Sequence, residues 1–169
     1  MMIRFLWAFF CGLVVFPCAA FLYLWLGYAP VATKAAPLPF EKRITALALN
    51  ARVSRDASKQ AGVPPTEENL MAGAKIYSTY CAVCHGAIGQ SKPPIAKGEY
   101  PPPPQMFDGK GVTNDPVGVT HWKVANGIRL TGMPAFTGTL SDTQMWQVSQ
   151  LLANGNKLPP AVRQFLAAE

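Results

Sequence analysis

The longest apolar run lies at the N-terminus. Residues 5–28 contain no charged side chain, and Arg4 stands immediately before them. As a helix at about 1.5 Å per residue, the run would be roughly 36 Å long, enough to cross a hydrocarbon core of roughly 30 Å. Trp7 lies near one end and Trp25 and Tyr28 near the other, as aromatic residues at membrane interfaces do. The pattern predicts one transmembrane helix.

Two other interpretations of this segment were weighed. The apolar core of a signal peptide is usually about 7–15 residues long, which is shorter than this run, and no clean A-x-A cleavage pattern follows it. A lipoprotein site at Cys18 is disfavoured by Phe16 and Pro17 before it. We therefore interpret residues 1–29 as an uncleaved anchor. Cys11 shares a helix face with Cys18, which fits plain packing in lipid, with acylation or a partner helix as the alternatives.

The next segment, residues 30–61, has a different composition. Residues 29–40 are rich in Ala and Pro, which is typical of a semi-rigid tether. Residues 41–60 have helical spacing, with Ile44 and Leu47 on one side and several cations elsewhere. Such a basic, weakly amphipathic helix fits an anionic membrane surface, a partner subunit or a solvated spacer. We interpret 30–61 as a tether followed by a basic juxtamembrane helix.

Residues 62–169 carry helix signals separated by Gly and Pro, without strand-like alternation or repeats. Four helices are expected, beginning at Thr66, Asp115, Ser141 and Pro160 and ending near Tyr80, Asn126, Asn154 and the C-terminus. A long loop thick with Gly and Pro separates the first two, and it includes the prolines at 101–104. A loop of that length inside a compact domain is unusual unless a non-protein group fills the space it wraps. The fold class is therefore all-α.

The charge distribution bears on the kind of partner. The net charge is +6 and the pI is about 9.3, but the basic residues concentrate between Lys34 and Lys59. After residue 62 the charges nearly cancel. No nucleic-acid-binding motif is present. We therefore expect no nucleic-acid partner.

The motif Cys81-Ala-Val-Cys84-His85 carries the chemistry. Two thiols at this spacing can each add to a vinyl group of one porphyrin, and the adjacent histidine is then held under the iron. A structural zinc site would need about four ligands, and the chain has no second C-x-x-C. A thioredoxin-like pair would need a βαβ context. The motif predicts one covalent haem c, with thioethers at Cys81 and Cys84 and His85 as an axial iron ligand.

The second axial ligand is less directly specified. The candidates are Met106, Met133, Met145 and His121. A Met/His pair raises the haem potential and suits electron transfer. Met133 lies in an irregular loop where Gly132 permits close backbone approach and a proline stiffens the turn, so we prefer it. Met145 falls mid-helix and His121 is on a helix beside a tryptophan, both typical of packing residues. Spacing does not exclude Met106.

Further motifs follow in a fixed order between about residues 66 and 155. They are Gly73, Tyr77, Cys81 to Gly86, Pro94, the string from Asn126 to Phe136, and Leu140-Ser-Asp142 leading to Trp146. In this order the domain resembles the class I (monohaem) cytochromes c, especially the bacterial membrane-anchored kind. The C-x-x-C-H motif alone is shared by many haem proteins, whereas the ordered combination is far more specific.

This resemblance implies a small cytochrome c haem domain in which the first and last helices cross, with Gly73 letting Trp146 approach closely. It implies that the carbonyl of Pro94 accepts the ring N–H of His85, which orients the ring. It also makes Met133 the expected distal ligand.

The resemblance also suggests that Tyr100, Trp122 or Arg129 contacts the haem propionates. Because bacteria attach haem c on the periplasmic side, the family implies a single-pass protein of the bacterial inner membrane, with Arg4 inside and the haem domain in the periplasm. Redox proteins would be the partners.

Six-coordinate iron leaves no position for substrate, so we expect an electron carrier rather than an enzyme. An exposed haem edge is expected near Ala82, Val83, Pro134 and Ala135. Two alternatives stay open: a fixed subunit of a respiratory complex, and a haem enzyme or gas sensor with a labile sixth ligand. The second would need acid or base residues at the distal site, where the sequence offers only Arg129.

Overall fold

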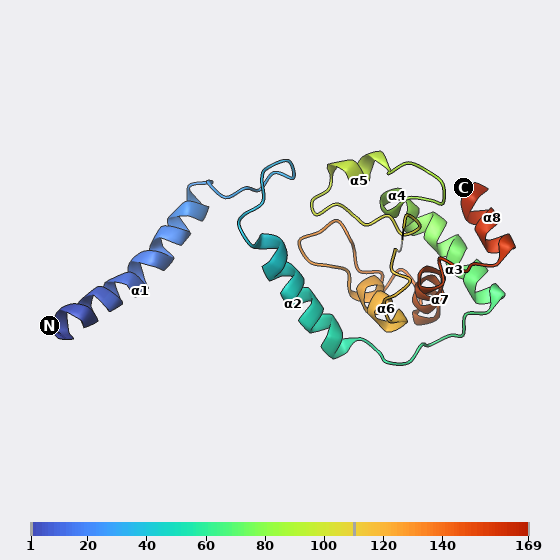
Figure 1. The fold of residues 1–169 in the computed structure, drawn as a ribbon, viewed down its shortest axis with the longest axis horizontal. Coiled ribbons are helices and arrows are strands. Elements are labelled where there is room, and N and C mark those ends of the chain that lie inside the picture. Colours follow the sequence, from blue (N-terminus) through green and yellow to red (C-terminus); the bar gives the residue numbers. More distant parts are fainter. Residues whose placement is uncertain (1, 110, 169) are drawn as a thin grey trace. The chain divides into compact units, whose positions relative to one another are not determined.

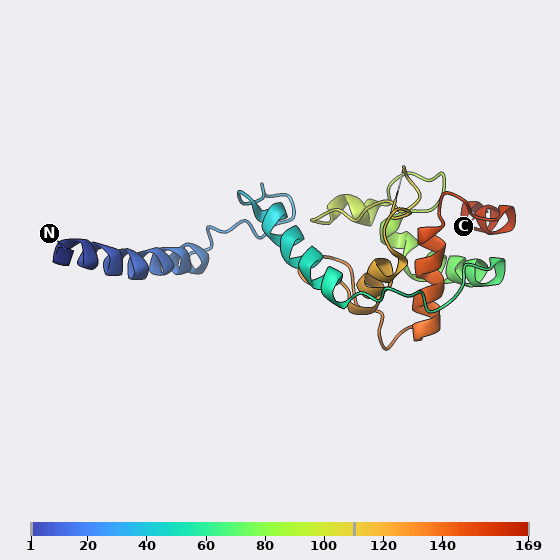
Figure 2. The ribbon, with the colours of Figure 1, turned by 60° about the horizontal axis from the view of Figure 1, so that its bottom comes forward.

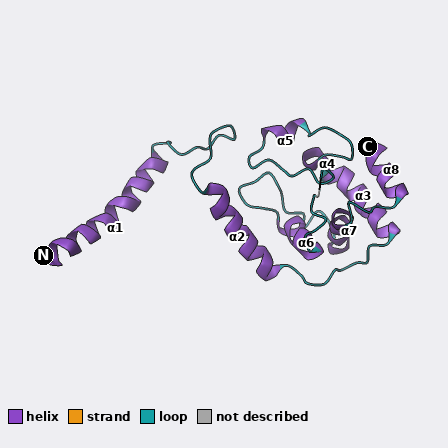
Figure 3. Ribbon diagram, viewed as in Figure 1, coloured by secondary structure: helices purple, strands orange, loops and turns teal. Residues whose placement is uncertain are grey.

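The computed structural model describes residues 2–109 and 111–168, and in the first helix it describes the side chains at 4, 7 and from 9 onward. The remaining residues of the predicted anchor and haem domain lie outside the described part of the chain, as do the remaining side chains of the first helix, including that of Phe5 at the start of the apolar run. The described chain forms helices α1 to α8 and contains no strand (Figures 1, 2 and 3). The all-α fold class is confirmed.

The chain divides into two compact units, residues 1–41 and residues 42–169. Helix α1 (Met2–Trp25) belongs to the first, and its described side chains are exposed. Among the helices in the described part of the chain, none is both long and apolar enough to cross a membrane. The anchor over 5–28 and the boundaries of the three predicted segments stay predictions.

Helix α2 (Glu41–Asp56) is shorter than the predicted basic helix. Arg52 and Arg55 both form ion pairs with Asp56 near its C-terminal end. The hydrogen bond from Arg55 lowers the pKa of Asp56, with further help from the charge of Arg52. Val53 is buried, whereas Ile44 on the opposite side is exposed. The apolar side chain of Ile44 is therefore exposed to solvent on a helix that carries several cations.

The caps of two predicted helices are present. Helix α3 (Glu67–Tyr80) begins after Thr66, whose hydroxyl accepts a hydrogen bond from the backbone in the first turn. Helix α7 (Asp142–Ala153) begins with a reciprocal capping box between Ser141 and Gln144. Such caps satisfy backbone N–H groups that have no partner within the helix. Both predictions are confirmed.

Helices α6 (Val117–Asn126) and α8 (Pro160–Ala168) also lie where they were predicted. Two short helices were not expected: α4 (Ala82–His85) and α5 (Pro94–Gly98). Each has little more than one turn, so neither carries the apolar periodicity that reveals a longer helix.

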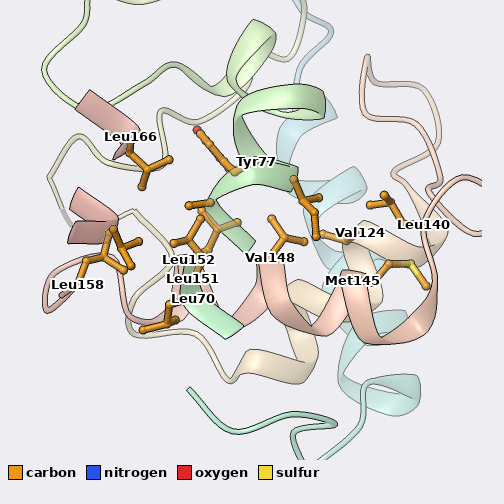
Figure 4. Packing of buried hydrophobic residues seen from close by; sticks show 13 residues of the cluster. Leu70, Tyr77, Val124, Leu140, Met145, Val148, Leu151, Leu152, Leu158 and Leu166 are labelled. Atoms are coloured by element: carbon orange, nitrogen blue, oxygen red, sulfur yellow. The ribbon is translucent and has the colours of Figure 1, made fainter. Parts of the chain in front are cut away.

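The core of the second unit forms where α3 packs against α7, with α6 and α8 beside them. Figure 4 shows Tyr77 of α3 and Val148 and Leu152 of α7 pointing into this core. The backbones meet at Gly73, because a Cβ there would meet the carbonyl group of Gln147. The predicted crossing of the first and last long helices is therefore present.

Trp146 does not use the space at Gly73, so that part of the prediction was wrong. Its indole ring lies against Gly62, where a Cβ would meet ring atoms. The indole ring also stacks on the imidazole of His121. The reason is helical geometry, since adjacent residues of α7 point about 100° apart and Gln147 is the one whose backbone faces α3.

Candidate functional site

The C-x-x-C-H motif forms the short turn that follows α3. Helix α4 ends at His85 and is followed by Gly86, whose φ of 73° is a left-handed conformation that favours glycine. The hydroxyl of buried Tyr77 donates to the carbonyl oxygen of Gly86 at 2.5 Å. Burial raises the pKa of Tyr77, so the hydroxyl stays protonated as a donor. The turn that presents His85 is thereby attached to the core.

Cys81, Cys84 and His85 line one mostly apolar cavity. The empty space within it, including the part open to solvent, is about 1090 Å³. Its walls come from α3, α4, the proline run 101–104, α6, the loop from Ile128 to Phe136, and α7. The long loop predicted to wrap a non-protein group does contribute to this cavity.

The histidine ring is held by a carbonyl of the proline run. His85 Nδ1 lies 2.8 Å from the carbonyl oxygen of Pro104. The prediction that Pro94 supplies this carbonyl was wrong, because Pro94 is the first residue of the short helix α5, whereas the carbonyl that meets His85 Nδ1 belongs to Pro104 in the loop beyond that helix. With Nδ1 as the donor to this carbonyl, Nε2 is the unprotonated nitrogen available to a metal.

Both motif thiols are protonated in this environment. Burial raises the pKa of Cys81 to about 12, and the nearby Cys84 adds to the rise. Burial also raises the pKa of Cys84, helped by Glu99, whose carboxylate accepts a hydrogen bond from the Cys84 thiol at 3.4 Å. Sequence reasoning missed Glu99, because nothing in the local pattern shows that α5 ends beside the attachment motif.

Met133 lines the cavity from the loop between α6 and α7. The backbone N–H of Met133 donates to Thr131 Oγ1 at 3.1 Å, and its carbonyl accepts from Ile128 N at 3.2 Å. Gly127, at a φ of 64°, lets this loop fold back, because a Cβ there would meet the backbone of residues 133–135. The sulfur-bearing side chain is therefore presented by a hydrogen-bonded loop.

The other axial-ligand candidates are placed differently. Met106 lines the cavity, but its backbone N–H donates to the carbonyl of His85 at 3.3 Å, so it lies beside the attachment motif. Met145 is buried in the α3–α7 core, as predicted for a packing residue. His121 Nε2 lies 2.9 Å from Asp142 Oδ1, outside the described cavity lining. This arrangement favours Met133.

Four further residues were expected around the haem. Among the residues described as lining the cavity, Pro94, Tyr100, Trp122 and Arg129 do not occur. Glu99 and Lys123, the neighbours of Tyr100 and Trp122 in the sequence, do line it. Arg129 is exposed. The propionate contacts predicted for Tyr100, Trp122 or Arg129 stay predictions.

The residues present fit a covalently held haem. Two thiols and an imidazole with a free Nε2 face one apolar cavity, and a thioether side chain lines it from another loop. The family model described as cytochrome c oxidase, cbb3-type, subunit III matches residues 68–152, half of the chain. The chain belongs to this family. As a cbb3-type subunit III relative, it has a cytochrome c domain that binds haem c covalently and serves haem-based electron transfer.

No curated protein matches the chain. A solved structure, a chain of the reducing HAO-like protein complex of Kuenenia stuttgartiensis, is similar to this cbb3-type subunit III relative, with 28% identity and a TM-score of 0.48. The match covers 58% of this chain and 49% of that chain, so this chain spans about half the length of that one.

Proposed function

We propose that the chain carries one electron at a time on a single haem c held by thioethers at Cys81 and Cys84, with His85 and Met133 as axial ligands. The observation that carries this proposal is the 2.8 Å contact between His85 Nδ1 and Pro104, which orients the ring beside two cysteines in a cavity that Met133 also lines. When bound, the haem iron supplies a one-electron couple.

The protein's own groups adjust this couple. The Pro104 carbonyl fixes the ring tautomer of His85 and makes the imidazole more basic. The Met133 thioether is a neutral, soft ligand that raises the potential. With haem bound, the mostly apolar walls would limit the access of water to the iron, and His85 and Met133 would supply both axial ligands. These features support an electron carrier and offer no site for a substrate.

The haem edge would meet partners at an exposed apolar rim, which we define as Val83, Leu130, Pro134 and Ala135. The side chain of Val83 is 59% exposed and that of Leu130 is 89% exposed. Ala82, also expected here, is half-buried. Transient redox contacts are small, and a neutral apolar rim suits them. We propose redox proteins as partners, and the description of the matching family supports membership of a respiratory oxidase complex.

We further propose that residues 5–28 anchor the chain in the bacterial inner membrane, with the haem domain in the periplasm. The uncharged sequence of this run supports the anchor, as does helix α1, which continues through the run as far as Trp25. In this proposal residues 1–29 are the anchor, 30–61 the tether and basic helix, and 62–169 the haem domain. A tether keeps the domain at a high local concentration near membrane partners.

Absorption spectra of the detergent-purified protein test the proposed ligation. We expect a low-spin c-type spectrum in both redox states, a weak far-red band from methionine bound to ferric iron, and no change with carbon monoxide. A high-spin spectrum, or ready binding of carbon monoxide, would contradict the closed His85/Met133 site. It would favour a haem enzyme or gas sensor with a labile sixth ligand.

A further inference from the structure

The run of prolines at 101–104 passes beside the attachment motif, and its backbone has an unusual set of hydrogen-bonding groups. Proline has no backbone N–H, so this run presents carbonyl oxygens and no backbone donors. One of these carbonyls, that of Pro104, holds the ring of His85. The position of the run against the motif therefore depends on donors from other residues.

Gln105, the first residue after the prolines, supplies such a donor. Its Nε2 lies 3.3 Å from the carbonyl oxygen of Pro103 and 3.3 Å from that of Cys84. Both facing atoms are acceptors, so the amide nitrogen and not the oxygen must point at them. The half-buried side chain thus joins the proline run to the last turn of α4.

The residues on either side of Gln105 also contact the attachment motif. Pro104 contacts the ring of His85, Gln105 contacts Cys84, and Met106 N donates to the backbone carbonyl of His85. Gly86 leaves room for the glutamine, because a Cβ at this position would meet Gln105 Oε1. Three consecutive residues therefore contact the haem-binding turn, and the middle one, Gln105, does so through its side chain.

We propose that Gln105 is a positioning residue for the axial histidine: its amide holds the Pro104 carbonyl at His85 Nδ1. This inference rests on the proposed function, in which His85 binds the iron. Hydrogen bonds to the outer nitrogen of a metal-bound histidine fix its orientation and raise its basicity. A more basic ligand stabilises ferric over ferrous iron, so weakening this hydrogen bond raises the midpoint potential.

The substitution Gln105→Met tests the proposal, because it keeps the length and neutrality of the side chain and removes the donor. The exposed Gln90 provides the matched control, Gln90→Met. Redox titrations of the full-length, detergent-solubilised holoproteins should give Gln105→Met a higher midpoint potential than both the wild type and the control. The far-red methionine–iron band should persist. Identical potentials for the two variants and the wild type would overturn the role of Gln105.

Hydrogen exchange in the unmodified protein gives a second test, which holds even where Gln105→Met fails to take up haem. In the reduced holoprotein, we expect the side-chain amide protons of Gln105 to exchange at least about tenfold more slowly than those of Gln90. Equal exchange would also overturn the proposal. If the wild type is low-spin and the midpoint potentials of the variants are unchanged, only the role of Gln105 is refuted. If the wild type is high-spin, the proposed His85/Met133 ligation is refuted as well.

Discussion

The imidazole of His121 stacks on the indole of Trp146, with ring centroids 3.8 Å apart and planes 11° apart. His121 belongs to α6 and Trp146 to α7, and the loop between these helices carries Met133. Asp142, 2.9 Å from His121 Nε2, adds a polar contact at the start of α7. The stacked pair thus joins the two helices whose connecting loop lines the haem cavity.

Replacing this histidine should destabilise the fold without changing haem ligation. We expect His121→Ala to lower the free energy of unfolding by about 1–3 kcal/mol, since it removes ring stacking and leaves a gap against Trp146. Asp142 is largely exposed, so Asp142→Asn should cost less than about 1 kcal/mol. Denaturant unfolding of the holoproteins measures both. Loss of the low-spin spectrum in His121→Ala would instead mean that this histidine binds the iron.

The close approach of α3 and α7 makes a second prediction. Gly73→Ala places a methyl group where the carbonyl of Gln147 lies, and we expect a loss of about 2–4 kcal/mol in the free energy of unfolding. Gly98→Ala is the matched control, because nothing lies within 4 Å of a Cβ at that helical position. The control should be neutral or slightly stabilising. Equal effects of the two substitutions on thermal unfolding would contradict the crossing at Gly73.

These two helices also show what sequence could and could not predict. Caps such as Thr66 and the Ser141–Gln144 box depend on residues three positions apart, so their signals are local and the helix starts were correct. The partner of Gly73 was misassigned, because which side chain of α7 faces α3 depends on packing between segments distant in sequence.

The same division runs through the haem site. The C-x-x-C-H motif is local and was found directly, and the loop of Met133 does line the cavity with it. Pro94 was chosen from the resemblance, whereas the structure brings Pro104 to His85. Glu99 and Gln105 act across a folded loop, and no spacing rule in the sequence indicates such contacts.

Removing the proposed distal ligand should open the iron. We expect Met133→Ala to lose the far-red band, to bind carbon monoxide when reduced, and to lower the midpoint potential by on the order of 0.1 V, within the ~0.8 V over which axial ligands set haem potentials. Met106→Leu is the control, because Met106 lies beside the His85 backbone. Its spectrum should stay low-spin. If Met106→Leu lost the far-red band and Met133→Ala kept it, the assignment would have to be exchanged.

The exposed rim allows a test of docking. Val83→Lys adds a charge to the apolar rim without touching an axial ligand, so we expect slower electron transfer to a purified redox partner and an unchanged spectrum. Ala168→Lys, at an exposed position on α8, adds the same charge elsewhere. Stopped-flow kinetics at two salt concentrations compare the two variants. Equal rates for both variants and the wild type would count against docking at this rim.

The anchor can be tested with a single charge in the apolar run. Val15 lies near the middle of residues 5–28, and an arginine at the centre of a membrane span costs about 2.5–3.5 kcal/mol. We therefore expect Val15→Arg to reduce the amount of chain that alkaline-washed membranes retain, and to reduce covalent haem attachment, since the chain would no longer be held at the periplasmic face. Ala32→Arg, in the tether, should leave both unchanged. Full retention of Val15→Arg would mean that residues 5–28 do not span the membrane, whereas release of the wild type by the wash would mean that the chain associates with membranes only peripherally.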